Sequence, residues 1–384
     1  MDQTQKPNQK TLQAFRELLS DSGYIHYYLA FGNGNMRQQE WGDYASNLPT
    51  QVQALVKLFL LNQWLEITAV SELLGKDVYQ LLLSFEILTT KDNFTFTDDY
   101  VLVCVNSIWL FCQINSHLAP PSVYFGSDSV ALSHYHIPQY GGKSLDLCAG
   151  SAIQAMNIAR HTQHEVDAVE INPRAIMMAR FNLYLNHLDE RVKLFNLSAE
   201  EYAQQNHNQY SLIVFNPPFV PVPQSHQFPF VGNGGPDGLG MVKTILNLYL
   251  PKLAEGGTVE FLGFVPGLNG NPTFIGEFEK ILAQHPGYSG HITLVTKFRL
   301  QPNNQLYDNM VLRTALNTKI LVAAAYEALT EHFRAIHANE VYLYFCRIRK
   351  NTKQPSDSQL TVINLARELY LGEIIRSTIW QLPV

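Results

Sequence analysis

The chain has 384 residues, of which 46% are hydrophobic and 16% charged, so it has an ordinary globular composition and room for two domains. Its formal net charge is −6, and residues 1–120 carry seven Lys or Arg against twelve Asp or Glu. A protein surface that neutralises several phosphates needs a basic face, so this balance makes nucleic acid an unlikely partner.

Hydropathy and cysteine content narrow the cellular context. No apolar stretch reaches the roughly 18–20 residues of a membrane helix, and the polar first ten residues lack the apolar core of a signal peptide. The cysteines are scattered and form no CxxC pair: Cys104, Cys112, Cys148 and Cys346. We therefore expect a cytoplasmic protein with no membrane association, no disulfide framework and no metal site.

The first 120 residues show a pattern of helices followed by a short strand. Apolar residues recur at helical spacing over 10–30 and 50–66. Two short helices are expected over 67–74 and 77–85, and a strand over 94–97. This order predicts a helical, winged-helix-like N-terminal domain over residues 1–120. Such modules bind DNA or serve as dimerisation or substrate-lid domains; the acidic balance favours the second use, which leaves a homodimer open.

From residue 121 the pattern changes to alternating strands and helices. Strand-like runs cover 144–148, 165–171, 192–196, 211–215 and 258–264, and helical runs cover 152–161, 174–185 and 241–250. This alternation predicts an α/β fold with a doubly wound, Rossmann-like parallel sheet over residues 121–350. Within it we expect a helical insertion near 305–338, with one helix over 314–336. Residues 351–384 are expected to form a C-terminal extension.

The most informative segment is Asn216-Pro217-Pro218-Phe219, which follows the apolar run 211–215. Proline cannot donate a ladder hydrogen bond and disfavours helix in the preceding residue, so the strand must end at Asn216. Open α/β sheets bind ligands at the carboxyl ends of their strands. A carboxamide, free carbonyls and an aromatic face there can hold a planar nitrogen and orient its lone pair. The alternative is a Pro-rich loop without chemistry.

A second candidate region is the turn that follows the strand at 144–148. Only Gly150 keeps a glycine of the dinucleotide fingerprint, and Cys148 and Ala152 occupy the flanking positions. A pyrophosphate needs glycines and free amides there, so a nicotinamide cofactor is disfavoured. Asp146, at the strand end, is a candidate contact for a cationic amino-acid group.

The next two strand ends supply further candidates for a nucleoside site. Glu170 lies 24 residues after Asp146, close to the spacing of about 20 expected for a ribose-binding carboxylate. Taken alone, it could equally be a surface acid. Asn196 ends the following strand with an amide that could bind an adenine edge, and Leu197 could pack on the ring.

These residues carry a family resemblance. The segments DLCAGSA, VEINP, FNLSAEEY and LIVFNPPF, in this order, resemble class I S-adenosylmethionine-dependent methyltransferases over about residues 122–265. The NPPF element is similar to that of the amino-methyltransferases, which methylate planar nitrogens. GGPDGL at 234–239 resembles a stretch of the glutamine N5-methyltransferases of release factors. The resemblance implies S-adenosylmethionine as cofactor, bound by Asp146, Cys148, Gly150, Ser151, Glu170, Ile171, Asn196, Leu197 and Asn216.

The resemblance also implies roles around the NPPF turn. The Asn216 carboxamide oxygen and the Pro217 carbonyl would accept hydrogen bonds from the methyl acceptor, and Phe219 would stack on its planar group. Phe125 and Asp128 lie where this family has a segment that covers the donor, so they are candidate contacts for the methionine end or the substrate. His134 and His136 are expected to be structural, because nothing in the sequence positions them.

Three functions are compatible with these features. The first is an N-methyltransferase for a small-molecule, amino-acid-derived or peptide-like acceptor, over which the acidic N-terminal domain and the C-terminal extension would close. The alternative is a protein glutamine or rRNA base N-methyltransferase. The third is a winged-helix regulator whose core senses a nucleoside. An intact NPPF argues against the third, because a sensor does not need a turn that orients an acceptor.

Overall fold

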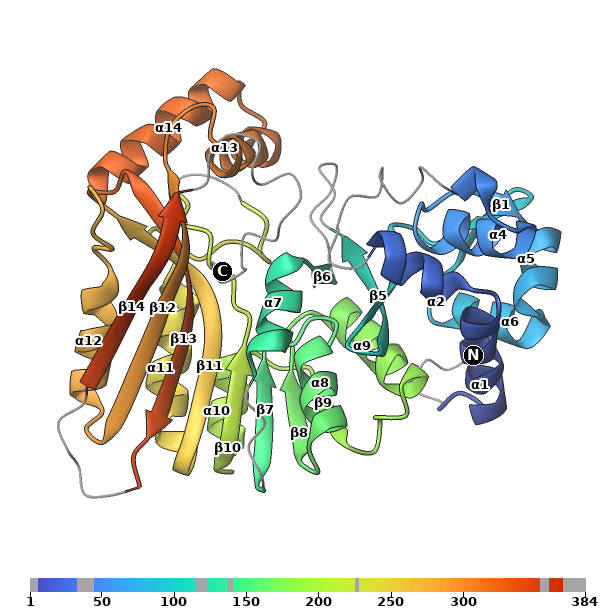
Figure 1. The fold of residues 1–384 in the computed structure, drawn as a ribbon, viewed down its shortest axis with the longest axis horizontal. Helices are drawn as coiled ribbons and strands as arrows, with labels where there is room; N and C mark the ends of the chain where they lie inside the picture. The colour runs from blue at the N-terminus through green and yellow to red at the C-terminus, as the bar shows by residue number, and fades with distance from the viewer. Residues whose placement is uncertain are drawn as a thin grey trace.

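The computed structural model describes residues 6–32, 45–114, 123–136, 141–224, 228–352 and 359–368. The fold is built around an eight-stranded sheet (Figure 1). Across the sheet the strands lie in the order β14-β12-β13-β11-β10-β7-β8-β9. Their bounds are β7 (Lys143–Leu147), β8 (Glu165–Val169), β9 (Val192–Phe195), β10 (Tyr210–Phe215), β11 (Leu253–Gly267), β12 (Tyr288–Arg299), β13 (Glu340–Lys350) and β14 (Gln359–Glu368).

The sheet is parallel from β11 to β9 and mixed beyond β11. Strand β13 runs antiparallel to both β11 and β12, and β14 is parallel to β12. The chain order reverses between β7 and β10, which lie side by side. A doubly wound sheet binds its ligand at such a switch point. The predicted Rossmann-like fold is therefore confirmed, and the sheet places the ends of β7 and β10 together.

Helices cover both faces of the sheet. Side chains of α8 (Ile153–His161) and α9 (Pro173–Leu185) belong to one hydrophobic core, and those of α10 (Ala199–Gln205), α11 (Gly240–Tyr249) and α12 (Ile275–Gln284) to another. Strand β10 contributes to both: Leu212 and Val214 pack in the first core, Ile213 and Phe215 in the second. This explains why its sequence is continuously apolar, since successive side chains on a strand point to opposite faces.

Two helices, α13 (Gln305–Thr318) and α14 (Val322–Ala335), lie between β12 and β13. The prediction of one helix over 314–336 is wrong, because α13 ends at Thr318 and Lys319 interrupts the helical backbone. Lys319 has a φ of 57° in the left-handed region, which ends α13. The apolar residues keep a helical spacing on both sides of Lys319, so the sequence pattern did not show that the helix ends there. Residues 353–358 and 369–384 of the predicted C-terminal extension lie outside the described residues.

The N-terminal segment contains short helices and two small sheets. In one sheet β3 (Phe94–Phe96) lies between β1 (Leu65–Glu66) and β2 (Thr89–Lys91), and in the other β5 (Ile108–Ile114) lies between β4 (Tyr100–Val105) and β6 (Tyr124–Phe125). The helices of this segment are α1 (Gln9–Asp21), α2 (Tyr24–Tyr27), η1 (Tyr28–Gly32), η2 (Ala45–Asn47), α4 (Thr50–Phe59), α5 (Ile67–Leu74) and α6 (Lys76–Ser84). Two further helices lie later in the chain, α7 (Ser127–Tyr135) and η3 (Leu250–Lys252).

Two asparagines attach this segment to the large sheet: Asn182 of α9 and Asn186, which follows that helix. The Asn182 side chain accepts a hydrogen bond from the Phe111 N–H at 2.8 Å and donates one to the Phe111 carbonyl at 3.0 Å. Asn186 binds the N–H and the carbonyl of Trp109 in the same way. One hydrophobic core joins α1 and α4 to α8 and α9. The N-terminal segment thus packs directly on the helices of the large sheet, and the predicted domain boundaries stay a prediction.

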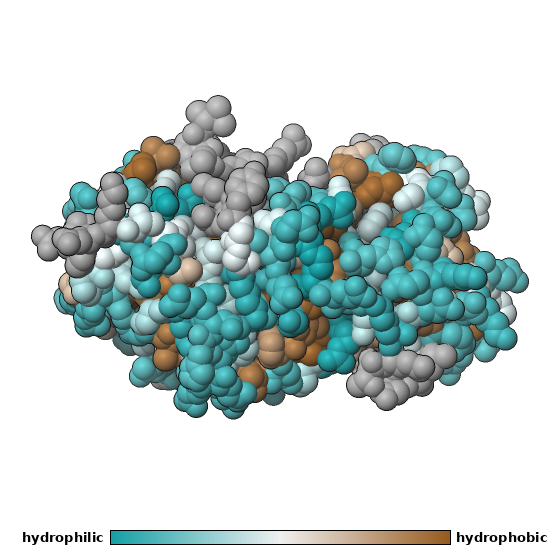
Figure 2. Space-filling model, turned by 90° about the horizontal axis from the view of Figure 1, so that it is seen from below, coloured by the Kyte–Doolittle hydropathy of each residue, from teal (hydrophilic) through white to brown (hydrophobic). Residues whose placement is uncertain are grey.

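The helices and one face of the surface bear on membrane association. Within the described ranges, no helix combines the length and the apolar character of a membrane span. Figure 2 shows the molecule from below, and on this face hydrophilic residues predominate while apolar residues form separate patches.

Candidate functional site

A pocket of about 300 Å³ lies at the carboxyl ends of β7, β8 and β10. Such a volume lies at the lower end of the range for small-molecule sites, about 300–1,000 Å³. Most of the residues predicted to bind the cofactor line it, namely Cys148, Gly150, Ser151, Glu170, Ile171, Leu197 and Asn216. The fold therefore brings together residues from strand ends that are far apart in the sequence.

The turn after β7 has an alternating left-handed backbone. Cys148, Gly150 and Ala152 have φ values of 55°, 52° and 63°. Only one of these three positions is glycine, the residue that adopts this conformation most readily. A left-handed conformation costs a non-glycine residue roughly 1–2 kcal/mol. The turn directs the Gly150 N–H to the Glu170 carboxylate, where it donates a hydrogen bond of 2.9 Å.

The Glu170 carboxylate lies between the turn after β7 and the residues that follow β8. Its side chain is nearly buried; Oε2 accepts from the Gly150 N–H, and Oε1 accepts from the Asn172 N–H at 2.8 Å. Burial raises the pKa of Glu170, and the two N–H groups oppose that shift. A carboxylate has about four lone-pair sites, so two remain for ligand hydroxyls. Ile171, 49% exposed, and Leu197 line the same pocket and offer apolar contacts to a planar base.

Asp146 and Asn196 do not belong to the described lining of this pocket. Asp146 Oδ2 accepts from the Ala155 N–H at 2.9 Å in the first turn of α8. Asn196 Nδ2 donates to the carbonyls of Glu170 and Ile171, both at 2.9 Å. These side chains fix a helix start and a strand end. They bind the backbone of the segments around the pocket, and their predicted contacts with the cofactor stay predictions.

A second pocket of about 100 Å³ adjoins the first. The two share Tyr124, Asn216 and Val231, so Asn216 lies between them. The smaller pocket is also lined by Asp128, Pro217, Phe219 and Arg313. All three residues predicted to be catalytic thus meet here.

Phe125, predicted as a substrate contact, lies elsewhere. It is fully buried in the core, on a strand that pairs with β5, and it lines neither of these pockets as the structure describes them. Asp128, the other predicted contact, does line the smaller pocket.

The Asn216 carboxamide has a fixed orientation. Its Nδ2 donates to Asp128 Oδ2 at 2.6 Å and to Ser129 Oγ at 3.3 Å. Because an ionised carboxylate only accepts hydrogen bonds, the amide nitrogen must face Asp128. The Asn216 Oδ1 atom is buried and has no hydrogen-bond partner among the described residues. A buried acceptor without a partner costs about 1–3 kcal/mol, which a ligand N–H would recover.

Asp128 fixes the orientation of the Asn216 carboxamide. It is almost fully buried, and its Oδ1 accepts from the Tyr124 hydroxyl at 2.6 Å. Burial raises the pKa of Asp128, while the hydrogen bonds from Asn216 and Tyr124 oppose the shift. Burial and the neighbouring Asp128 charge raise the pKa of Tyr124. Tyr124, Asp128 and Asn216 thus form a hydrogen-bonded chain that reaches both pockets.

The GGPDGL stretch packs its backbone on the NPPF turn. A Cβ on Gly234 would lie 2.7 Å from Phe219 Cα, and one on Gly238, whose φ is +76°, would lie 2.6 Å from the Phe219 carbonyl oxygen. Only glycine allows this approach. Asp237 Oδ1 accepts from the Leu239 N–H at the start of α11, so its role is structural. The two sequence segments are therefore one structural unit.

Several residues of the site were not predicted. Ser129 and Gln154 line the larger pocket, and Arg313 of α13 lines the smaller one. Ser129 directly follows the predicted Asp128, and this neighbouring position in the sequence could have indicated that it belongs to the site. Arg313 lies in a helix far along the chain, and no local pattern connects it with the NPPF turn.

Asp146 generates a prediction about stability. Burial raises the pKa of Asp146 to about 8, the Glu170 charge adds to this, and the hydrogen bond from Ala155 opposes it. The unfolded chain loses this proton near pH 4, whereas the folded chain keeps it to about pH 8. Between these values the free energy of unfolding should fall as pH rises, by up to about 1.4 kcal/mol per pH unit.

Asp146→Asn should remove that contribution. Urea unfolding at about pH 5 and about pH 7 should give a smaller decrease in stability for the variant than for the unchanged chain. Glu165→Gln, at the exposed start of β8, is the control and should keep the original decrease. An identical pH dependence in the Asp146 variant would contradict the assignment.

Comparison with known proteins shows a distant similarity to methyltransferases. Residues 127–228 match the model of the family described as "Methyltransferase small domain". The ribosomal protein uL3 glutamine methyltransferase of Bradyrhizobium diazoefficiens is 36% identical over 132 residues, which are 32% of this chain and 41% of that protein. The tRNA1(Val) (adenine(37)-N6)-methyltransferase of Yersinia enterocolitica is 34% identical over 96 residues, which are 24% of this chain and 38% of that protein.

A structural neighbour is TYW2 of P. horikoshii in complex with MeSAdo, with a TM-score of 0.37 and 13% identity over 81% of this chain and 97% of the other. The chain covers about two fifths of the length of the curated relatives that it matches. Those relatives are named as a glutamine methyltransferase and an adenine N6-methyltransferase. The predicted resemblance to class I S-adenosylmethionine-dependent methyltransferases is confirmed as a distant one, which lies in the methyltransferase small domain at residues 127–228.

Proposed function

We propose that this protein transfers a methyl group from S-adenosylmethionine to the planar –NH₂ nitrogen of a macromolecule, in the first place a glutamine side chain of a protein. The observation that carries the proposal is the buried Asn216 Oδ1, which lacks a partner among the described residues and lies between two adjoining pockets. The named relatives act on protein glutamine or tRNA adenine, so they favour this acceptor class over the small molecule that the sequence suggested first.

In this proposal the larger pocket holds the cofactor. Glu170 would accept the ribose hydroxyls, and Ile171 and Leu197 would contact the adenine ring. The turn at Cys148–Ala152 would pass close to the amino-acid part. When bound, the cofactor supplies a methyl group on a positively charged sulfur. Because that donor is already activated, the protein mainly has to position the acceptor, which can lower a barrier by roughly 7–11 kcal/mol.

The smaller pocket would orient the acceptor nitrogen. An –NH₂ group has two N–H donors, which Asn216 Oδ1 and the Pro217 carbonyl would accept. The Phe219 ring, which packs on Phe264 with ring centroids 4.7 Å apart, would stack on the planar group. As the new N–C bond forms and the C–S bond breaks, positive charge develops on the nitrogen. Both acceptors then bind the N–H groups more strongly, and one proton leaves to solvent.

A specific observation favours a second candidate, an adenine of RNA. Adenine also carries a planar –NH₂ group, and several relatives are named as tRNA adenine N6-methyltransferases. This conflicts in part with the prediction that nucleic acid is an unlikely partner. We place glutamine first because the glutamine enzyme matches over a longer segment, 132 residues against 96.

A labelling experiment would distinguish the acceptors. The full-length protein and S-adenosylmethionine with a tritiated methyl group would be added to a cell extract, which is then separated by size after protease or RNase treatment. We expect protease-sensitive, RNase-resistant label, and methylated glutamine after enzymatic digestion. RNase-sensitive label would establish the adenine candidate instead. Label confined to small molecules, or no label above a heat-inactivated control, would contradict the proposal.

Asn216→Ala should lower kcat by about 100–1,000-fold, because it removes an acceptor aimed at charge that develops in the transition state. S-adenosylmethionine should still bind with little change, since Glu170 and the β7 turn remain. Methyl transfer would be measured with saturating cofactor, and cofactor binding by calorimetry. A variant that turns over normally would show that Asn216 does not orient the acceptor.

Glu170→Ala should weaken S-adenosylmethionine binding by at least about tenfold, because a hydrogen bond to a charged group contributes about 1.5–3 kcal/mol. Calorimetry on the unchanged chain and the variant measures the effect. Glu165→Ala removes an exposed carboxylate at the opposite end of β8 and is the matched control. Equal affinities for all three proteins would remove Glu170 from the ribose site.

A further inference from the structure

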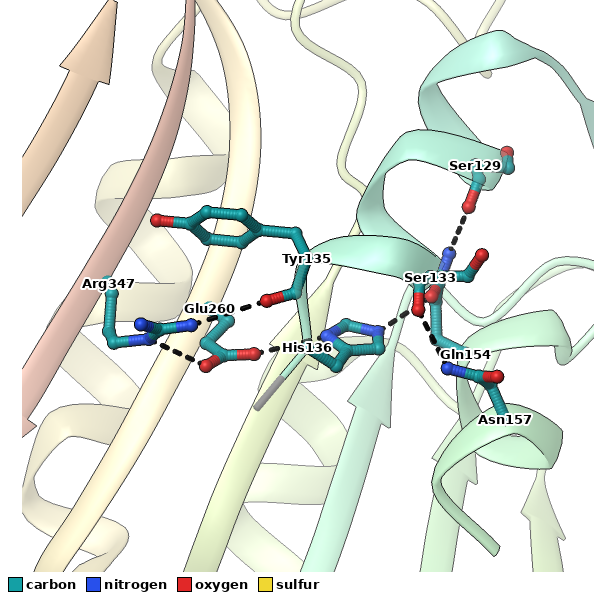
Figure 3. A network of polar contacts seen from close by, with 8 residues as sticks. All are labelled: Ser129, Ser133, Tyr135, His136, Gln154, Asn157, Glu260 and Arg347. Atoms are coloured by element: carbon teal, nitrogen blue, oxygen red, sulfur yellow. Dashed lines mark hydrogen bonds and ion pairs between the residues drawn. The ribbon is translucent and has the colours of Figure 1, made fainter. Parts of the chain in front are cut away.

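His136 belongs to a buried polar network next to the site (Figure 3). It follows α7, the helix that carries Asp128 and Ser129, and its side chain is only 3% exposed. Its Nδ1 lies 3.1 Å from Glu260 Oε2 of β11, and its Nε2 lies 2.7 Å from Gln154 Oε1 of α8. Neither pocket of the candidate site includes His136, so the proposed chemistry leaves this network without a role.

The groups at the two ends of the network, the Ser129 carbonyl and the Glu260 carboxylate, decide which atoms donate and which accept. The Ser129 carbonyl can only accept, and Gln154 Nε2 donates to it at 2.8 Å. Gln154 Oε1 therefore faces His136 and requires a donor at Nε2. On the other side, Glu260 Oε1 accepts from Arg347 Nε at 2.7 Å, as expected of an ionised carboxylate. Glu260 Oε2 then requires a donor at His136 Nδ1. With a proton on both ring nitrogens, His136 is an imidazolium.

We propose that His136 is a positioning residue that, in its doubly protonated form, fixes the start of α7 and thereby the Asn216 carboxamide. This inference rests on the proposed function. The connection runs from Glu260 through His136 and Gln154 to the Ser129 carbonyl. Ser129 Oγ in turn accepts from Asn216 Nδ2 at 3.3 Å. The antiparallel half of the sheet is thus linked to the residue that orients the acceptor.

Charged and titratable groups lie around the network. Glu260, fully buried on β11, and Arg347 of β13 are the charged groups that face it from the sheet. Arg347 also donates to the Tyr135 carbonyl at 3.3 Å and lies over the Tyr135 ring. On α8, His161 lines a cavity next to His136, together with Ser133 and Asn157. An imidazole with a single proton would leave one ring nitrogen without a hydrogen to donate to Glu260 or Gln154, and one hydrogen bond of the network would be lost.

NMR of the imidazole nitrogens tests the protonation state without any need for activity. In the full-length protein at neutral pH, the signals that disappear in His136→Gln should show protons on both Nδ1 and Nε2. His164→Gln is the matched control, since His164 is also buried but binds Ser144 outside the network. Signals of a neutral His136 ring would overturn the proposal, whatever the protein's activity.

Kinetics tests the positioning role. His136→Gln should lower kcat by about tenfold while the acceptor KM stays within about threefold, because misplacement and not lost binding is expected. In a plot of kcat against pH, the unchanged chain should show a fall at alkaline pH, the alkaline limb, and the variant should lack that limb. Glu260→Gln keeps each contact if the new amide nitrogen donates to His136 Nδ1, so it should lose less kcat than His136→Gln and also lack the limb.

The outcomes separate the two proposals. Normal kcat and an unchanged pH profile in His136→Gln would overturn the positioning role, even if Asn216→Ala is inactive. If Asn216→Ala is fully active, the proposed function fails, while the NMR result still decides the state of His136. Should His136→Gln unfold, Glu260→Gln carries the kinetic test, and retention of the alkaline limb there overturns the proposal.

Discussion

The site depends on one buried pair, the Asp128 carboxylate and the Asn216 carboxamide. A carboxylate in the interior is costly unless donors surround it, and Tyr124 and Asn216 supply two such donors at 2.6 Å each. The same pair leaves the carboxamide only one orientation, with its nitrogen on Asp128 and its oxygen free to accept. An amide that was not held in this way could turn its nitrogen toward the acceptor and would then repel the N–H groups that it should bind.

The rest of the fold keeps this pair in place. The strand order puts β7 beside β10, so the turn that would bind the donor lies next to the turn that would bind the acceptor. Gly234 and Gly238 pack against the Phe219 backbone and restrict the NPPF turn from one side. Helix α7 carries Asp128 from the other side, and Gln154 links that helix to α8 and, through His136, to the sheet. The two reactants are therefore positioned by elements that pack on one another.

Local chemistry in the sequence predicted the strand ends and the turn, because apolar periodicity and the consecutive prolines act within a few residues. It did not predict which way a side chain points. Asp146 and Asn196 lie at the expected strand ends, yet they bind backbone groups behind the pocket. The bond between Asp128 and Asn216 joins positions 88 residues apart, which only the folded chain brings together. Likewise, the net charge of residues 1–120 describes one segment and not the acceptor site, so it does not identify the acceptor.

The non-glycine residues in the turn after β7 bear on which ligand the pocket can accept. Cys148 and Ala152 adopt the left-handed backbone that glycine adopts most readily, and only Gly150 between them is glycine. A pyrophosphate needs a glycine-rich turn that it can approach closely, so this turn does not favour it. A nucleoside sulfonium has no phosphates and would be held through its ribose and its amino-acid part. The turn therefore suits the proposed donor better than a nicotinamide dinucleotide.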